Sequence, residues 1–275
     1  MLRKLMKHEL RATGRVMGPM LGLTLASAVG GNIAVYTLVD GGNGVLSMIG
    51  VFLLIVFFAA LAGAFILSFA LMIWRFYQNL LRDEGYLMMT LPVSVHAHVL
   101  SKLFVSLIWA AATVVTAGAA MCILVFNLEF VSDIWRDLGE LIRNLQFSGL
   151  RLMDFAGHAV LLMLEFILLL AVADGGLCLF FYASMVVGHS FAHHKGLLSI
   201  AACFVLSTGW SLLQNGAMHM LNLLAPDGIS LGLQGVSPLA AAHISLLGVT
   251  AAAMVFAALW YGITTYFLKN RLNLG

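Results

Sequence analysis

Charged residues are scarce in this chain. Asp, Glu, Lys and Arg make up 9% of its 275 residues, whereas hydrophobic residues make up 62%. An ordinary soluble domain carries about 25% charged and about 45–50% apolar residues. The mean hydropathy of +1.02 agrees with this excess of apolar side chains. The composition therefore excludes a soluble globular domain and predicts an integral membrane protein.

The chain also has few cysteines and lacks a phosphate-binding motif, and both absences limit the functions it can have. Its three cysteines, Cys122, Cys178 and Cys203, are scattered through apolar runs and have neither disulfide nor zinc spacing. No Gly-Lys dipeptide occurs, so the GxxxxGK[ST] phosphate-binding loop is absent. We therefore expect the cysteines to be packing residues, and we expect no nucleotide to bind to this chain in the P-loop manner.

Long apolar windows predict the architecture. A helix needs about 20 apolar residues to cross a hydrocarbon layer of ~30 Å, and only helices or closed barrels satisfy their backbone hydrogen bonds there. Barrel strands have about 10 residues, fewer than these windows contain. The sequence thus predicts an all-α, polytopic membrane protein, with residues 1–275 as a single transmembrane domain. The six predicted spans are residues 16–39, 46–74, 103–128, 155–187, 197–225 and 240–268.

The distribution of Lys and Arg predicts the orientation. An even number of spans places both termini, the segment 75–102 and the loop near residue 190 on one side, and most of the basic residues lie there. Only Arg136, Arg143 and Arg151 fall on the other side. Because basic loops stay in the cytoplasm, we expect both termini to be cytoplasmic. The net charge of +2 is spread along the membrane edge and does not indicate a nucleic-acid partner.

Two segments outside the spans are amphipathic. Residues 2–15 place basic and apolar side chains on different faces, which predicts an amino-terminal interfacial helix on membrane lipids. The alternative is a basic flank without a fixed orientation. Residues 129–154 repeat apolar side chains on one helical face, and Arg136 and Glu140 lie four apart. This pattern predicts an external amphipathic helix, which either lies on the outer leaflet or covers a second membrane subunit.

A polar island, residues 75–102, separates two uncharged runs. Pro92 disfavours helix at the preceding residue, and Ser94 can cap a new helix that leads into the third span. The pattern predicts a helix, a break and a second helix outside the membrane. Paired acids beside aromatic and Met residues favour a protein partner here, and the alternative is a solvated connector.

Four stretches carry a resemblance to a known family. RFYQNLLRDEGYLMMTLPVS in the island, KHELRATGR near the amino terminus, GHSFAHHKGLLSI from Gly188 and YFLKNRLNL near the carboxyl terminus resemble the cytoplasmic segments of bacterial permeases. These permeases belong to the ATP-binding-cassette (ABC) transporter superfamily, in the type-2 exporter class. The resemblance implies a six-span subunit of the bacterial cell membrane, the same number of spans as the hydropathy predicts.

The resemblance also implies a mechanism. The island would be a coupling helix that sits in a groove of a separate ABC ATPase, where ATP and Mg²⁺ bind, so this chain would hold no cofactor and would not itself be an enzyme. The permease would pair with a second copy or a homologous permease and move a hydrophobic or amphipathic substrate by alternating access. The implied ATPase-coupling residues are Arg82, Asp83, Glu84, Gly85, Tyr86, Met88, Leu91 and Pro92.

A histidine-rich loop has two interpretations. His189 and His193 have the i, i+4 spacing of a zinc-binding pair, but no carboxylate or Cys ligand is near, so we expect no metal there. A membrane enzyme built on these histidines would need such a metal. The resemblance implies a second cytoplasmic contact loop instead, formed by His189, His193, His194 and Lys195.

Glu165 and Asp174 are the only formal charges within a predicted span. A buried charge at membrane depth costs at least a few kcal/mol, which indicates either a translocation path or a protonated, hydrogen-bonded acid. Nine residues put them on different faces of one helix, which disfavours a shared dyad. A proton-coupled carrier or channel using both acids is the alternative function. Candidate partners on neighbouring spans are Asn32, Gln214 and Asn215, whereas His158 lies on the face of Glu165, and His243 is expected at the external interface.

Overall fold

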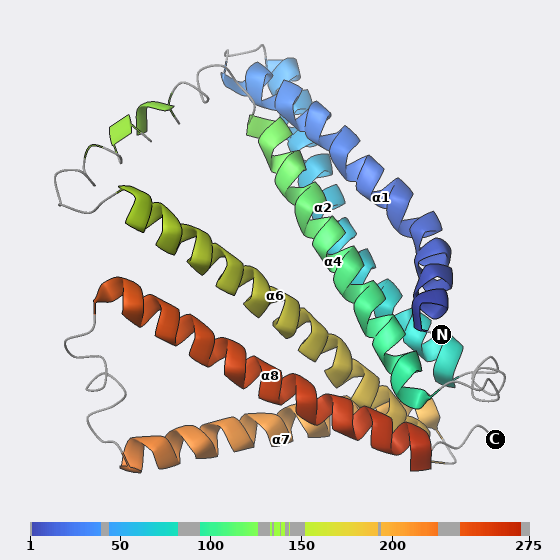
Figure 1. Cartoon of the computed structure of the whole chain (residues 1–275). Coiled ribbons are helices and arrows are strands. Elements are labelled where there is room, and N and C mark those ends of the chain that lie inside the picture. Colours follow the sequence, from blue (N-terminus) through green and yellow to red (C-terminus); the bar gives the residue numbers. More distant parts are fainter. Residues whose placement is uncertain are drawn as a thin grey trace. The chain divides into compact units, whose positions relative to one another are not determined.

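The predicted all-helical architecture is confirmed. A computed structural model describes residues 2–39, 44–81, 94–125, 133, 135–137, 139–140, 143, 152–191, 194–224 and 237–270, and no β-strand occurs among them. Six helices within these ranges are long and apolar enough to cross a membrane. They are α1 (Leu2–Val39), α2 (Gly44–Leu81), α4 (Val95–Val125), α6 (Leu152–His189), α7 (Lys195–Leu224) and α8 (Pro238–Asn270), labelled in Figure 1.

At the polar island, α2 and α4 continue well beyond their predicted spans. The second span was expected to end at residue 74 and the third to begin at residue 103, whereas α2 reaches Leu81 and α4 begins at Val95. At 1.5 Å per residue, α2 is about 57 Å long, well above the ~30 Å of a hydrocarbon layer. Ser94 caps α4 as predicted, because its Oγ accepts a hydrogen bond of 3.3 Å from the amide of Ala97. The predicted coupling residues between them, from Arg82 to Pro92, lie outside the described residues.

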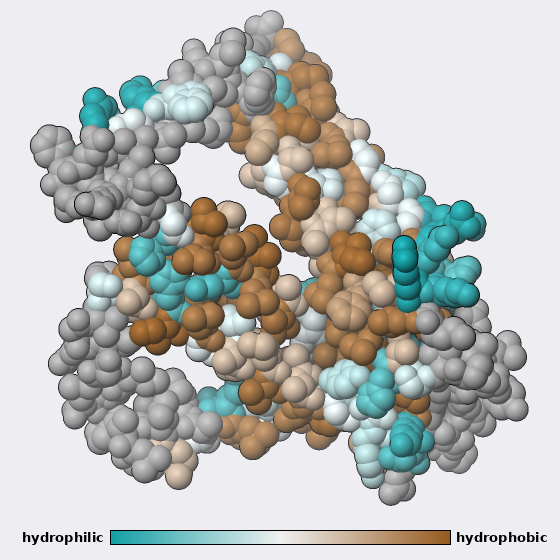
Figure 2. Space-filling view, in the orientation of Figure 1, coloured by the Kyte–Doolittle hydropathy of each residue, from teal (hydrophilic) through white to brown (hydrophobic). Residues whose placement is uncertain are grey.

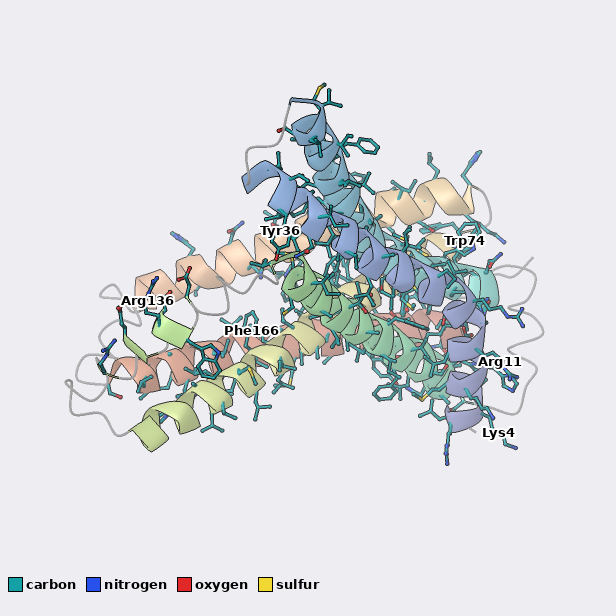
Figure 3. The ribbon with its side chains drawn as sticks, turned by 90° about the horizontal axis from the view of Figure 1, so that it is seen from above. Lys4, Arg11, Tyr36, Trp74, Arg136 and Phe166 are labelled. Carbon is teal, nitrogen blue, oxygen red and sulfur yellow. The ribbon has the colours of Figure 1, made fainter. Side chains whose placement is uncertain are left out.

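The amino-terminal segment 2–15 is helical but is not a separate element. It is continuous with the first span in α1, which contains Pro19. Proline lacks an amide hydrogen, and its ring crowds the carbonyl four residues earlier, so it bends a helix. Figures 1 and 3 show this bend, with Lys4 and Arg11 on its amino-terminal side, and Figure 2 shows hydrophilic atoms there. The placement of this segment on a membrane surface stays a prediction.

The segment 129–154, predicted to be an external amphipathic helix, is described in part. Asp133, residues 135–137, residues 139–140 and Arg143 are helical. Arg136 lies 3.2 Å from Asp133 and 3.8 Å from Asp137, and all three side chains are exposed. Exposed ion pairs contribute about 0–1 kcal/mol, so they add little to the stability of this segment.

The described chain forms two compact units. The first unit comprises residues 1–72 and 104–157, and the second comprises residues 73–103 and 158–275. Both α2 and α4 cross from one unit to the other.

In the first unit, α1 packs against both α2 and α4. A small core contains Ala28, Phe57, Ala120 and Leu124. A Cβ atom at Gly50 of α2 would lie 3.3 Å from the Ala34 carbonyl and 2.8 Å from the Thr37 hydroxyl, so glycine permits this close approach of α1 and α2.

Two polar contacts join α1 and α4 within the first unit. The Nδ2 atom of Asn32 donates to the carbonyls of Ile123 and Leu124 at 2.9 and 3.1 Å. Near the other end, Nε1 of Trp109 donates to Oγ1 of Thr13 at 2.7 Å. The earlier residue of α1 contacts the earlier residue of α4, and the later residue contacts the later ones, so α1 and α4 are parallel. Asn32 therefore has partners within α1–α4, which accounts for a polar amide inside a membrane span.

In the second unit, α6 and α8 are also parallel. Glu165 of α6 contacts His243 of α8, a Cβ at Gly176 would lie 3.0 Å from Phe256, and Phe180 packs edge-on against Trp260. Trp210 of α7 contacts Phe256 edge-on, with ring centroids 4.8 Å apart. Parallel packing places the amino-terminal ends of α6 and α8 on the same side of this unit (Figure 1).

Candidate functional site

The carboxyl-terminal end of α2 is anchored on α6. The rings of Phe76 and Tyr182 are stacked, with centroids 3.9 Å apart and planes 7° apart, and both side chains are fully buried. Aromatic pairs contribute about 0.5–1.5 kcal/mol beyond the burial of their surface. The stack lies five residues before the end of α2 and so fixes the helix that leads to the segment 82–93.

A second contact links the end of α2 to the end of α6. The ring of Tyr77 meets the ring of His189 edge-on, with centroids 5.5 Å apart. Nδ1 of His189 lies 2.8 Å from the Met185 carbonyl, and because a carbonyl only accepts, this nitrogen carries the proton. The Ser199 hydroxyl lies 3.2 Å from the same nitrogen and donates to the carbonyl of Lys195 at 2.9 Å. The imidazole of His189 thus joins α2, α6 and α7.

The connection from α6 to α7 is tight. A Cβ atom at Gly188 would overlap backbone atoms of Ser199, so only glycine fits where the two helices approach. His194 has a φ of 54°, in the left-handed region, and its carbonyl accepts a hydrogen bond of 3.0 Å from Leu198 at the start of α7. This backbone makes a sharp turn that brings Lys195 and the beginning of α7 back against α6.

The residues of the predicted contact loop differ in their exposure. His189 is only 4% exposed, His194 is exposed, and Lys195 begins α7. His193 lies outside the described residues. The described part of the chain contains no group of three His, Cys, Asp or Glu side chains that could hold a metal ion. His189 therefore supports the loop from inside, whereas His194 presents its side chain to the outside.

The helix on the other side of the segment 82–93 is anchored on α8. Nδ1 of His96, in the first turn of α4, lies 2.7 Å from the phenolic oxygen of Tyr261. The second unit thus holds both helices that flank the segment, one through Phe76 and one through His96. Sequence reasoning missed these anchors, because each joins residues far apart in the chain.

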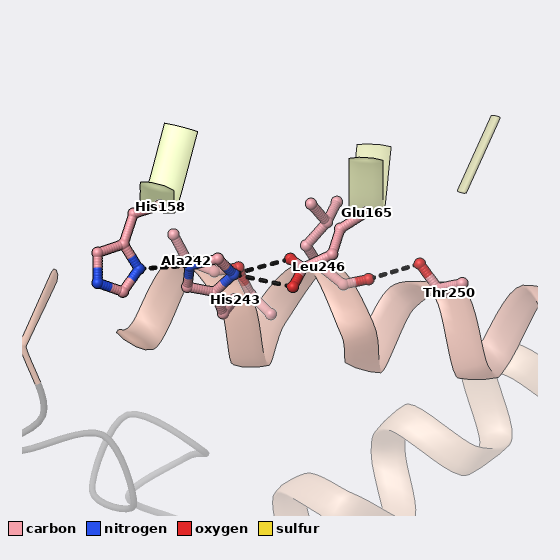
Figure 4. Close-up of polar contacts among 7 residues, drawn as sticks. His158, Glu165, Ala242, His243, Leu246 and Thr250 are labelled. Carbon is pink, nitrogen blue, oxygen red and sulfur yellow. Dashed lines mark hydrogen bonds and ion pairs between the residues drawn. The ribbon is translucent and has the colours of Figure 1, made fainter. Parts of the chain in front are cut away.

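A polar cluster lies between α6 and α8 (Figure 4). Nδ1 of His243 is 2.9 Å from both carboxylate oxygens of Glu165, and the other His243 nitrogen is 3.1 Å from Nδ1 of His158. The side chains of Glu165 and His243 are 18% and 16% exposed. Figure 2 shows hydrophilic atoms within a largely hydrophobic surface where α6 and α8 run side by side.

The partner of Glu165 differs from the candidates that the sequence suggested. Gln214 and Asn215 are exposed on α7, and the carboxylate meets His243 instead. A sequence signal was present: His158 and His243 each stand at the fourth residue of a predicted span, and these spans run in the same direction. Asp174 does not join the cluster. Its Oδ2 atom is buried and has no hydrogen-bond partner among the described residues.

The fold defines a broad class, an all-helical chain with six helices in its described part that are long and apolar enough to span a membrane. Comparison with protein-family models, with curated proteins and with solved structures found no match for this chain. The resemblance to ABC permeases thus rests on the four sequence stretches.

Proposed function

We propose that this chain is the membrane-spanning subunit of an ATP-driven exporter of the ABC superfamily. A separate ATPase would bind ATP and Mg²⁺ and dock on the segment 82–93, with Asp83 and Glu84 paired with its basic residues. The observation that carries the proposal is the anchoring of both flanking helices, because Phe76 stacks on Tyr182 of α6 and His96 meets Tyr261 of α8. A push on the segment would therefore reach α6 and α8 directly.

Close packing would transmit such a push from one helix to the next. Protein interiors are packed about as densely as organic crystals, so a displaced ring moves its neighbour rather than filling a void. Phe76 and Tyr182 are fully buried, and Tyr77 contacts the buried ring of His189. Closure of the ATPase would shift the end of α2, and α6 and the α6–α7 turn would follow. The exposed His194 would be a second contact with the ATPase.

The proposal includes the remaining partners. Two permeases, identical or homologous, would enclose a path that opens alternately to the two sides of a bacterial cell membrane. The long apolar helices favour a hydrophobic or amphipathic substrate, and both termini would face the cytoplasm, where basic residues collect. Asp174, whose Oδ2 has no hydrogen-bond partner among the described residues, is a candidate for the translocation path.

The test is a double substitution in the segment. The complex with its ATPase would be purified, reconstituted in vesicles and assayed for ATP-dependent efflux of a lipophilic fluorescent dye. Asp83→Ala plus Glu84→Ala should leave the complex assembled but abolish ATP-dependent efflux, because charge pairs at an interface fix its register. Asp133→Ala plus Asp137→Ala, an acidic pair in the external segment, should have no effect. Unchanged efflux in the first double variant would contradict the coupling role.

One observation favours a second function, a proton-coupled carrier. Glu165 is hydrogen-bonded to His243 between two membrane helices, an arrangement found in proton pathways. This function predicts transport that follows a proton gradient in vesicles without any ATPase. The same vesicles distinguish the two functions, because the exporter stays inactive without ATP.

A further inference from the structure

The α6–α8 contact is built on two matching stripes. On α6 the partly buried residues from 158 to 172 recur at spacings of three and four, and on α8 a series of partly or fully buried residues with the same spacing runs from 239 to 260. Such spacing marks one face of a helix. His158 and Glu165 lie on the α6 stripe, and His243 lies on the α8 stripe. The α6 stripe comprises residues 158, 162, 165, 169, 172 and 176, and the α8 stripe comprises residues 239, 243, 246, 250, 253, 257 and 260.

Hydrogen-bonding rules restrict where the protons of this cluster lie. An ionised carboxylate only accepts hydrogen bonds, so Nδ1 of His243 donates to Glu165. Nε2 of His243 and Nδ1 of His158 face each other at 3.1 Å, so one proton lies between them. It belongs either to His158 or to His243.

Both positions of that proton preserve every contact. With the proton on Nδ1 of His158, both imidazoles are neutral and the cluster carries the single negative charge of Glu165. When a further proton binds to Nε2 of His158, the proton on its Nδ1 moves to Nε2 of His243. His243 then becomes an imidazolium that donates to both Glu165 and His158, and His158 stays neutral. The cluster gains one proton, and its net charge changes from −1 to zero.

The apolar surroundings favour this uptake. An unneutralised carboxylate between membrane helices costs at least a few kcal/mol, whereas a hydrogen-bonded ion pair has no net charge. Within the described residues, these three side chains form hydrogen bonds only with one another. Asp174 lies on another face of α6, and the exposed His219 of α7 has no described contact with them. A single metal ion does not fit the cluster, because His243 uses its two opposite ring nitrogens.

We propose that His158, Glu165 and His243 form a proton-binding site that takes up one proton per chain and ties α6 to α8 when it is occupied. The proposal does not depend on an ATPase, so it stands or falls separately from the exporter function. Proton uptake at this site would strengthen the contact between α6 and α8, since the Glu165–His243 pair gains a full opposite charge.

The test is an NMR titration of the full chain in lipid nanodiscs, with ¹⁵N-labelled histidine. The pH would be varied from about 5 to 8, and the signals of His158 and His243, assigned by substitution, should change together with one midpoint. Glu165→Gln should lower the proton affinity at least about tenfold, a shift of about one pH unit. Asp174→Asn and His219→Gln should leave the midpoint unchanged.

A second variant, His243→Gln, keeps the proposal testable if Glu165→Gln does not fold. In His243→Gln the relay is cut, so the ¹⁵N signature of the His158 proton moving from Nδ1 to Nε2 should be lost. The proposal is overturned if His158 and His243 titrate at separate midpoints, if neither changes in this range, or if the His158 signature persists in His243→Gln.

Discussion

Phe76 of α2 lies face to face with Tyr182 of α6, with their ring planes 7° from parallel. Both rings are fully buried, and α2 ends five residues later at Leu81. Because of this packing, we expect the end of α2 and the adjoining part of α6 to move together. Substitutions at this contact should therefore have two distinct effects, one on the stability of the chain and one on its response to a partner.

Tyr182→Leu should remove the stack and leave a cavity, because the leucine side chain is smaller. We expect the free energy of unfolding to fall by more than the about 0.5–1.5 kcal/mol that an aromatic pair contributes, because the cavity adds its own cost. In the proposed complex, ATP-dependent dye efflux should fall more than ATP binding does. The control is Phe166→Leu, because Phe166 is 52% exposed on the same helix. Equal efflux in both variants would argue against transmission through the stack.

Gly188→Ala should disrupt the α6–α7 turn, because the new methyl group would overlap the backbone of Ser199. Overpacking of this kind costs typically about 1–3 kcal/mol. Unfolding in mixed detergent micelles measures the loss. Gly196→Ala, beyond the same turn, meets nothing within 4 Å and should be neutral or stabilising. If the two variants are equally stable, the helices do not approach as closely as described.

The hydrogen bond between Trp109 and Thr13 should contribute measurably to the packing of α1 on α4. Thr13→Val leaves the indole N–H without its 2.7 Å acceptor, and Trp109→Phe removes the donor. A double-mutant cycle of these two substitutions should give a coupling energy of about 0.5–1.5 kcal/mol, the net contribution of a typical hydrogen bond. A coupling energy near zero would show that the two helices are not joined at this position.

Cysteine labelling tests the parallel direction of α6 and α8. Ser190 follows the end of α6, and Ser237 precedes the start of α8, so the two residues should lie on opposite sides of the membrane. Ser237→Cys should react with an impermeant maleimide in intact cells, and Ser190→Cys should react only in inverted vesicles. The native cysteines would be replaced first. Reaction of both variants from the same side would contradict the crossing of α7.

The sequence predicted the six helices well, because each rests on a long apolar run. At the island, hydropathy placed the span ends at residues 74 and 103, whereas α2 continues to Leu81 and α4 starts at Val95, where Pro92 and Ser94 predicted a break and a new helix leading into the third span. Hydropathy detects the part of a helix that suits the membrane, and a helix that continues through polar residues leaves no such signal. Ser94 was the exception, because an N-cap is a local signal.

Contacts between helices could be predicted only in part. Glu165 was recognised as a costly group that needed a partner, but its partner His243 lies 78 residues away. Local periodicity identifies the face of a helix but not the helix that packs on it. The direction of the spans supplies some of the missing information, because it places His158 and His243 at similar depth. Nothing in the sequence indicated that Phe76 would stack on Tyr182.

The surplus length of α2 has a consequence for the lipids around the protein. A helix of 38 residues exceeds the thickness of ordinary bilayers, and such surplus length is accommodated by tilting, by kinking or by local thickening of the bilayer. A helix that is already too long also spans a thicker bilayer without any addition to its length. We therefore expect the protein to tolerate the changes in lipid composition by which cells adjust to temperature.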